Sequence, residues 1–199
     1  MESFIRTLTI ISLLAVLGYG LYWVKEYRDK TNHLYKVIAN LVDCNRDMKN
    51  TLLQGLVARF QYQGLPDNEE TPLDFERFVA SILRLCRGGK TSVTRAKGDY
   101  GVDIEHWRDE DVYLGQVKCC PLENKVGFEP IAIIHSQMVK QGAKGGFVVT
   151  TSDFTPMAKK YAKGLEIELI SGQELVNLWT ESLTAEKQRI PQVPAPKQA

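Results

Sequence analysis

The chain has 199 residues, of which 44% are hydrophobic and 25% are charged. This length fits one globular domain with additional segments, and the composition excludes a mainly disordered, a collagen-like or a multi-span membrane protein. The formal net charge of +1 provides no global field that would steer the protein onto nucleic acid. Evidence for a polyanionic partner must therefore come from local clusters of basic residues.

An uncharged stretch from Thr7 to Val24 lies near the start of the chain. As a helix it would extend about 27 Å, which is roughly the hydrocarbon thickness of a bilayer. Tyr19, Tyr22 and Trp23 gather at its C-terminal end, where aromatic rings favour the membrane interface. A buried helix and a cleaved signal peptide are the alternatives, but the stretch lacks a polar stripe and no small-residue cleavage site follows it. We therefore predict a transmembrane anchor within residues 1–24.

Basic residues flank this stretch unequally. Lys25, Arg28 and Lys30 follow it, whereas Arg6 alone precedes it. The positive-inside rule then predicts a single-pass protein of the inner (cytoplasmic) membrane, with the C-terminal domain in the cytoplasm. The cysteines agree with a reducing compartment, because they show no spacing typical of zinc sites or disulfide frameworks. They are Cys44, Cys86, Cys119 and Cys120.

Residues 25–63 carry apolar side chains at mostly three- and four-residue steps, which predicts a helical stalk. The pattern leaves open a short coiled coil, and hence a homo-oligomer formed through the stalk. Residues 64–71 combine glycine, proline, asparagine and acids, which is typical of a linker.

Residues 72–183 alternate between predicted helices and strands. Thr71 can cap a first helix that starts at Pro72 and ends before Gly88. The further predicted elements are strands at 91–95, 102–107 and 112–120, a helix at 130–142, a strand at 145–151, a helix at 155–164, a strand at 167–170 and a last helix after the capping box Ser171–Glu174. This order predicts an α/β domain with a mixed sheet flanked by helices. The proline-rich residues 184–199 are expected to form a disordered tail.

Two short motifs carry the candidate chemistry, GDYGVDI at residues 98–104 and QVK at residues 116–118. Asp103 lies at the start of the second predicted strand, and Gln116 and Lys118 lie two residues apart, on one face of the third. If these strands pair as a hairpin, a carboxylate, an amide oxygen and an ammonium group come together.

These groups suit Mg²⁺-assisted hydrolysis of a phosphodiester. Mg²⁺ prefers oxygen ligands, so Asp103 and Gln116 are the candidate metal ligands, beside a backbone carbonyl and a substrate phosphate. Lys118 would orient the attacking water or help to deprotonate it, and Glu76 on the first helix is within possible reach of the site. The spacing alone is a loose pattern, because each of these residues also has an ordinary structural explanation.

Several motifs stand in a fixed order within residues 73–178: FERFVASIL, GDYGVDI, GQVKC, KGGFVVTTSDFTPMAKKYA and IELISGQEL. This order resembles the Mrr-like restriction endonuclease domain, in the QxK subgroup of the PD-(D/E)xK nuclease superfamily. The resemblance implies a restriction-endonuclease-like core and Mg²⁺-dependent cleavage of DNA. It also implies that Asp103 is the principal metal ligand and that Gln116 and Lys118 form the QxK pair. Glu76 matches the acid on the family's first helix.

Local charge is compatible with a DNA partner. Five basic residues and no acid precede the first motif, namely Arg84, Arg87, Lys90, Arg95 and Lys97. A second cluster surrounds the strand at 145–151 and the helix after it, namely Lys140, Lys144, Lys159, Lys160 and Lys163. The sequence allows two interpretations of these side chains: they contact phosphate groups, or they simply face solvent.

The leading hypothesis is a membrane-anchored, cytoplasm-facing endonuclease that hydrolyses DNA phosphodiester bonds with Mg²⁺, in defence against foreign DNA. One alternative is a non-catalytic DNA-binding or docking module with the same fold at the membrane, and another is a structural partner in a membrane assembly. The chain departs from the family pattern in its predicted anchor and at Tyr100, where such domains often have glycine.

Overall fold

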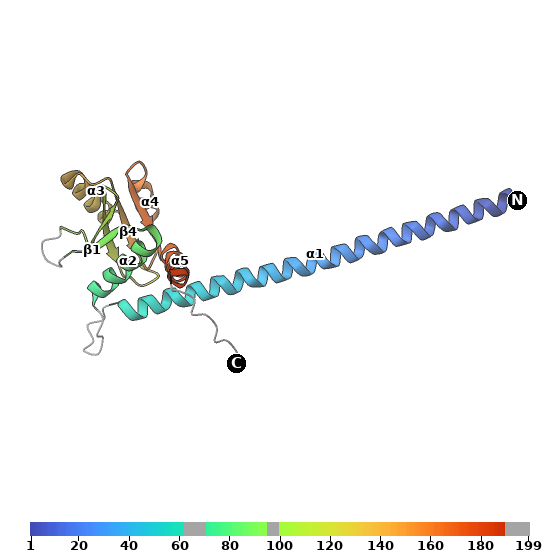
Figure 1. The fold of residues 1–199 in the computed structure, drawn as a ribbon, viewed down its shortest axis with the longest axis horizontal. Helices are drawn as coiled ribbons and strands as arrows, with labels where there is room; N and C mark the ends of the chain where they lie inside the picture. Colours follow the sequence, from blue (N-terminus) through green and yellow to red (C-terminus); the bar gives the residue numbers. More distant parts are fainter. Residues whose placement is uncertain (62–70, 95–99, 190–199) are drawn as a thin grey trace, which may run out of the picture. The chain divides into compact units, whose positions relative to one another are not determined.

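The computed structural model describes residues 1–61, 71–94 and 100–189, and the chain divides into two compact units, residues 1–48 and 49–199 (Figure 1). Helix α1 begins at Glu2 and ends at Phe60. Its residues up to Met48 form the first unit, and its last turns belong to the second. Apolar side chains along the first unit are exposed, among them Leu17, Leu34 and Leu41. Within the described residues, no helix combines the length and the apolar character needed to cross a membrane. The predicted anchor at residues 7–24 is therefore not supported by the structure.

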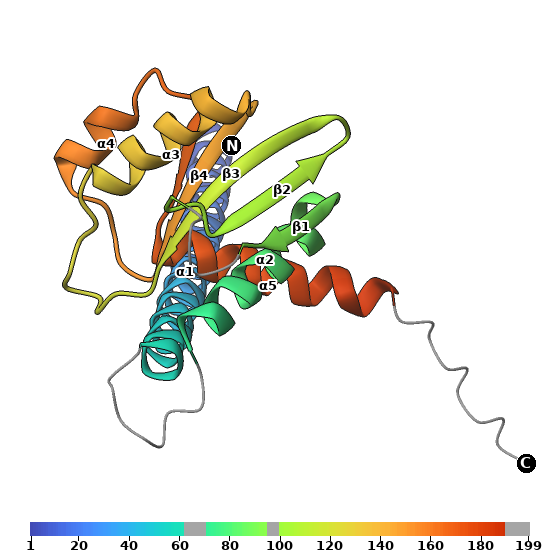
Figure 2. The same ribbon diagram turned by 90° about the vertical axis from the view of Figure 1, so that its left-hand side faces the viewer.

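A five-stranded sheet with the strand order β1-β2-β3-β4-β5 lies at the centre of the second unit (Figure 2). The strands are β1 (Lys90–Val93), β2 (Ile104–Arg108), β3 (Asp111–Lys118), β4 (Gly145–Thr150) and β5 (Ile167–Ile170). The first three pair antiparallel, whereas β3, β4 and β5 pair parallel. The mixed sheet predicted from the alternation of elements is confirmed.

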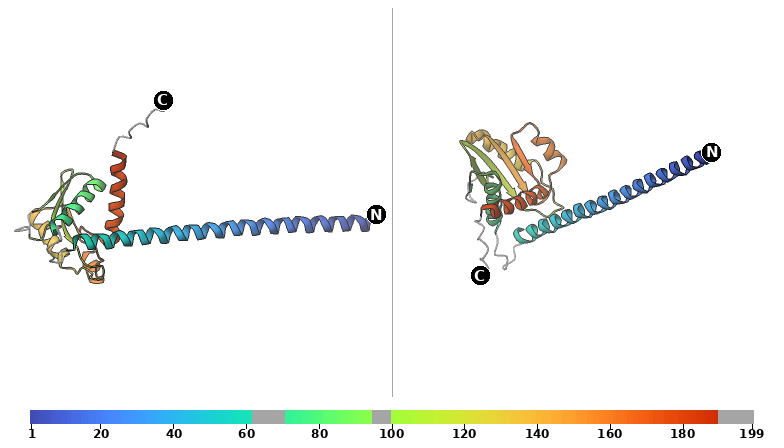
Figure 3. Two further views of the ribbon diagram at one scale, coloured as in Figure 1. Left: turned by 90° about the horizontal axis from the view of Figure 1, so that it is seen from below. Right: turned by 45° about the vertical axis from the view of Figure 1, so that its right-hand side comes forward.

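Helices cover both faces of this sheet, as Figures 2 and 3 show. On one face lie α2 (Pro72–Arg87) and α5 (Gly172–Arg189), and on the other lie α3 (Glu129–Gln141) and α4 (Pro156–Ala162). Each face has its own apolar core, because strand side chains alternate between the two faces. Phe147 and Val149 belong to the core under α2 and α5, whereas Val148 belongs to the core under α3.

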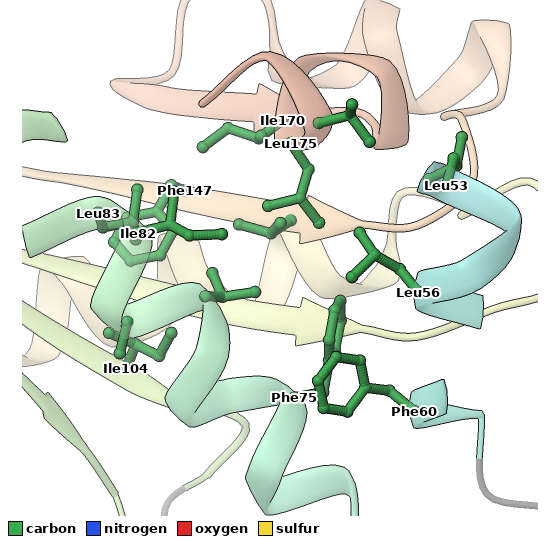
Figure 4. Close-up of a cluster of buried hydrophobic side chains, with 14 residues drawn as sticks. Leu53, Leu56, Phe60, Phe75, Ile82, Leu83, Ile104, Phe147, Ile170 and Leu175 are labelled. Atoms are coloured by element: carbon green, nitrogen blue, oxygen red, sulfur yellow. The ribbon is translucent and has the colours of Figure 1, made fainter. Parts of the chain in front are cut away.

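The last turns of α1 belong to the α/β unit rather than to a separate stalk. Leu53, Leu56 and Phe60 recur at steps of three and four residues, so they share one side of the helix. All three are buried in the core that contains Phe75 (Figure 4). The sequence pattern predicted the helix over this segment, but it did not distinguish a solvated stalk from a helix that packs on the domain.

Two helix starts follow the predicted capping chemistry. Thr71 caps α2, and its backbone N–H donates to Asp74 at 2.8 Å. The backbone N–H of Ser171 donates to Glu174 at 2.7 Å, which completes the predicted box at the start of α5.

The last helix differs from the expectation. α5 continues to Arg189, so residues 184–189 are helical, whereas the sequence predicted a disordered tail from residue 184. No proline or glycine stands between Gly172 and Pro191, and the lysine, glutamate, glutamine and alanine in this segment favour a helix. The rest of the predicted tail, residues 190–199, lies outside the described residues. The same holds for the predicted linker, apart from Thr71.

Candidate active site

Asp103 directly precedes β2 and lies beside the C-terminal half of β3. Its backbone N–H donates to the carbonyl of Gly115 at 2.8 Å, and its own carbonyl accepts from the N–H of Thr94 at 3.0 Å. The backbone N–H of Val117 donates to the carboxylate Oδ2 of Asp103 at 2.7 Å. Because both backbone and side chain are held, the carboxylate has a fixed place next to residues 115–117.

Gln116 lies on β3 with only 9% of its surface exposed. Its amide oxygen Oε1 is buried and has no hydrogen-bond partner in the described part of the chain. Such an acceptor costs about 1–3 kcal/mol when nothing satisfies it, so its presence calls for a ligand or a function. A divalent cation that prefers oxygen ligands would satisfy Oε1, and the adjacent carboxylate of Asp103 supplies a negative charge.

Lys118 ends β3 on the same face as Gln116, two residues further along the strand. It lines a cavity of about 260 Å³ between β3 and the start of α3. The other lining residues include Asn124, Lys125, Glu129 and Ile133. Lys118 thus reaches a hollow at this end of β3, whereas the amide oxygen of Gln116 is buried on the same face of the strand.

Glu76 lies apart from that pair. It lines a second cavity, of about 250 Å³, with Phe60, Val117 and Cys119. Val117 and Cys119 pack in the core under α2, so they point to the face of the sheet opposite Gln116 and Lys118. The structure brings Asp103, Gln116 and Lys118 to one end of the hairpin, and a role for Glu76 there stays a prediction.

The thiol of Cys119 lies on the face of the sheet opposite Gln116 and Lys118. Burial raises the pKa of Cys119 to about 11, so the thiol is neutral at ordinary pH. Among the described residues, no group of three or more histidine, cysteine, aspartate or glutamate side chains is arranged to hold a metal ion. A metal at this site would therefore be held by Asp103, the amide oxygen of Gln116, main-chain oxygen and the substrate.

The hydroxyl groups at the end of β4 are structural. Thr151 accepts from the backbone N–H of Cys120 at 2.8 Å and donates to the carbonyl of the same residue at 2.7 Å. Ser152 donates to the carbonyl of Leu122 at 2.9 Å, and Thr150 accepts from the N–H of Ser152 at 3.1 Å. All three residues are buried, so they fix the loop after Lys118 rather than contact a phosphate.

The first basic cluster is divided by the fold. Lys90 pairs with Trp107 at the far end of the hairpin, about 13 Å along the strands from Asp103. Arg84 and Arg87 lie in the last turn of α2, and Arg87 forms a two-pronged ion pair with Glu168, at 2.6 and 2.7 Å. Arg95 and Lys97 lie outside the described residues. DNA contact by this cluster stays a prediction.

The second cluster is partly neutralised by acids. Lys159 pairs with Asp153 at 2.8 Å, and Lys125 approaches the same carboxylate at 3.5 Å. The hydrogen bond from Lys159 is the largest of the effects that lower the pKa of Asp153. Lys144 lies 3.8 Å from Asp111.

Sequence reasoning did not single out Lys125, and it named Tyr100 only as a departure from the family pattern. Lys125 lines the same cavity as Lys118, and its position in the loop after the candidate strand β3 was the available signal. Tyr100 is 69% exposed and has a left-handed backbone with φ of 52°. The ammonium group of Lys140 lies 4.4 Å from the centre of its ring. This exposed ring lies three residues before Asp103 in the sequence.

Comparison with known families identifies the α/β unit. The family model Mrr_cat, a restriction endonuclease, matches residues 68–179, which is more than half of the chain. The type IV methyl-directed restriction enzyme EcoKMrr of Escherichia coli (strain K12) is 32% identical over 133 residues, covering 62% of this chain and 43% of that protein. The chain thus spans less than half the length of this curated relative.

Two solved structures share the fold. The MspJI restriction endonuclease, in complex with a 27-mer oligonucleotide, matches with a TM-score of 0.53 and 23% identity, over 70% of this chain and 32% of that one. The DNA modification-dependent restriction endonuclease AspBHI matches with a TM-score of 0.50 and 20% identity, over 70% of this chain and 38% of that one. The fold is therefore restriction-endonuclease-like, and the chain belongs to the Mrr-type restriction endonuclease family.

Proposed function

We propose that the α/β domain hydrolyses phosphodiester bonds in DNA with the help of a divalent metal ion, for which Mg²⁺ fits the donor groups best. The observation that carries this proposal is the buried Oε1 of Gln116, which has no hydrogen-bond partner among the described residues, near the anchored carboxylate of Asp103. An oxygen pair of this kind is suited to a hard cation. The family membership supports the reaction class.

Each residue has a distinct role in this proposal. Asp103 and Gln116 would hold the metal ion, and a bound divalent ion would supply positive charge against the phosphate. Lys118 orients the attacking water and stabilises the negative charge that builds on the phosphate oxygens. The hydrogen bond from Val117 keeps the carboxylate of Asp103 in position while the substrate enters.

We also propose that the biological role is defence against foreign DNA, with modified DNA as the first substrate to test. This proposal rests on EcoKMrr, whose name describes a methyl-directed restriction enzyme. Methylated and unmethylated copies of one plasmid, incubated with the full chain and Mg²⁺, separate modification-dependent cutting from general cutting.

The test of catalysis compares the parent with Asp103→Asn and Lys118→Met, and Lys36→Met is the matched control. Lys36 is exposed in the first unit and belongs to neither basic cluster, so its loss removes one charge without touching the site. The proposal expects cleavage to fall at least about 100-fold in the first two variants and to persist in the control. DNA binding without cleavage by the parent, at any Mg²⁺ concentration, would instead favour the non-catalytic binding module.

A further inference from the structure

Helix α1 carries the seven-residue repeat of a coiled coil over residues 24–52, with seam positions separated alternately by three and four residues. The seam consists of Val24, Tyr27, Thr31, Leu34, Ile38, Leu41, Asn45, Met48 and Leu52. Every charged residue between Val24 and Leu52 lies outside this seam. A helix that simply faced water would carry charges at these positions as well, so the pattern indicates a face that packs on a partner.

The structure leaves the seam uncovered as far as Met48. Its apolar residues from Val24 to Met48 are all exposed, with Leu34 at 58% and Leu41 at 64%. Beyond Met48 the helix packs on the α/β unit, where Leu53 is buried in the core. A continuous apolar stripe that the chain does not cover itself marks an interaction surface.

The residues of the seam and its flanks favour a second copy of this chain as the partner. Ile38 occupies an a position between Leu34 and Leu41 at d positions, the combination that favours two parallel strands. In a parallel pair, the exposed Val37 of one copy would face Val42 of the other and widen the apolar contact. No two flanking residues that would face each other carry like charges, so self-association meets no repulsion there.

Asn45 determines the orientation of the two copies. It is exposed in one chain and supplies the only amide side chain in the seam. In a parallel pair in register, a positions face each other, so the two amides can form hydrogen bonds with one another. In an antiparallel pair, a positions face d positions, so Asn45 would meet an apolar side chain such as Leu41 and lose its hydrogen bonds to water without replacement.

We propose that residues 24–48 form a parallel, two-stranded coiled coil with a second copy of this chain, in register at Asn45. The buried last turns of α1 provide a helical nucleus, which reduces the cost of starting so long a helix. Because α1 continues without a break to Phe60, both chains leave the coiled coil at the same end, and one assembly carries two α/β units. The assignment is independent of the proposed catalysis, because no residue of the Asp103 site takes part.

Sedimentation velocity of the full chain over a range of concentrations tests the association. Leu41→Lys places a charge in the seam, and Asn40→Lys places the same charge on the outer side of the helix as the matched control. The parent and the control should form dimers, and the seam variant should raise the dimer Kd at least about 100-fold with unchanged urea unfolding of the α/β unit. A monomeric parent would overturn the proposal, as would equal Kd values for the two variants. A monomer that binds vesicles of phosphatidylglycerol would replace the second copy by lipid.

Cross-linking tests the orientation and separates this seam from association through other surfaces. A Cys44→Ser background removes the exposed native thiol of α1. In that background, a short bismaleimide should join the two copies of Leu41→Cys, whose thiols face each other in a parallel pair. Asn40→Cys, on the outer side of the helix, should give at least about tenfold less covalent dimer. Equal yields from the two variants would mean that the chains associate without this seam and would overturn the proposal.

Discussion

The backbone N–H of Val117 donates a 2.7 Å hydrogen bond to Oδ2 of Asp103, which ties the candidate metal ligand to the strand that carries Gln116 and Lys118. The bond joins the residue just before β2 to β3, so the position of the Asp103 carboxylate depends on the position of β3. A main-chain hydrogen bond therefore holds the Asp103 carboxylate against the strand that carries Lys118. It also predicts that changes within β3 affect the site through the main chain.

Gln116→Leu tests whether the buried amide oxygen is kept for a ligand. Without metal, the variant should be more stable than the parent by about 1 kcal/mol, because an unsatisfied buried acceptor is replaced by an apolar group of similar size. Urea unfolding measures this difference in the free energy of unfolding. The stabilisation by Mg²⁺ that the parent is expected to show in a thermal melt should disappear in the variant. Loss of stability in the metal-free variant would show that Oε1 has a partner within the protein.

Gly115→Ala tests the packing of the Phe147 ring against β3, the strand that carries Gln116 and Lys118. A Cβ at position 115 would lie 2.0 Å from a ring carbon of Phe147, which is buried between β4 and α2. The substitution should lower the free energy of unfolding by about 2 kcal/mol or more. Gly55→Ala is the matched control, because a Cβ there meets nothing within 4 Å and alanine favours the helix, so stability should rise by about 1 kcal/mol. Equal effects of the two substitutions in urea unfolding would refute the close packing of Phe147 on β3.

The sequence predicted the hairpin of the candidate site better than it predicted the surroundings of that site. Asp103, Gln116 and Lys118 come together because two adjacent strands with a short turn can pair in only a few ways, and alternation then decides which side chains share a face. The position of Glu76 depends on which face of the sheet α2 covers, and no local pattern states this. Likewise, the sequence around Arg87 does not show that its side chain is paired. Its partner Glu168 lies on β5, 81 residues further along the chain.

The N-terminal helix α1 shows the same limit for a different reason. Helical periodicity predicted α1, but the partner of each apolar side chain is a tertiary property. Leu53 and Leu56 are buried in the α/β core, whereas Leu34 and Leu41 are exposed in the first unit, although all four have similar sequence surroundings. Helical periodicity therefore predicted the helix, but it did not predict the residue at which the helix begins to pack on the α/β unit.

Cysteine reactivity should differ sharply between two positions. Burial raises the pKa of Cys119 to about 11, whereas Cys44 is exposed on α1. Because the thiolate is the reactive form, iodoacetamide at about pH 8 should modify Cys44 readily and Cys119 hardly at all. Peptide mass spectrometry at timed intervals measures both rates, and unfolding in urea should bring them together. Similar rates in the folded protein would mean that the Cys119 thiol is accessible.

Tyr100→Asn tests substrate contact by the exposed ring. Asparagine tolerates the left-handed backbone at this position, so the fold should be unchanged while the aromatic surface is lost. We expect DNA affinity to weaken by about tenfold, in line with the loss of one stacking contact. Fluorescence anisotropy in an Asp103→Asn background measures binding without cleavage. Tyr35→Asn, at an exposed tyrosine of the first unit, is the control, and an equal loss in both variants would argue against a specific role for Tyr100.

Cleavage by Asp103→Asn is the most direct measure of the central claim. The asparagine oxygen can still accept the hydrogen bond from Val117, so the hairpin geometry is retained while the negative charge that would hold the metal is lost. With Mg²⁺ and methylated or unmethylated plasmid DNA, the parent should cut and the variant should cut at least about 100-fold more slowly, with unchanged thermal stability and DNA affinity. Cutting at the parental rate by Asp103→Asn would contradict the assignment of this residue as the metal ligand of a phosphodiesterase site.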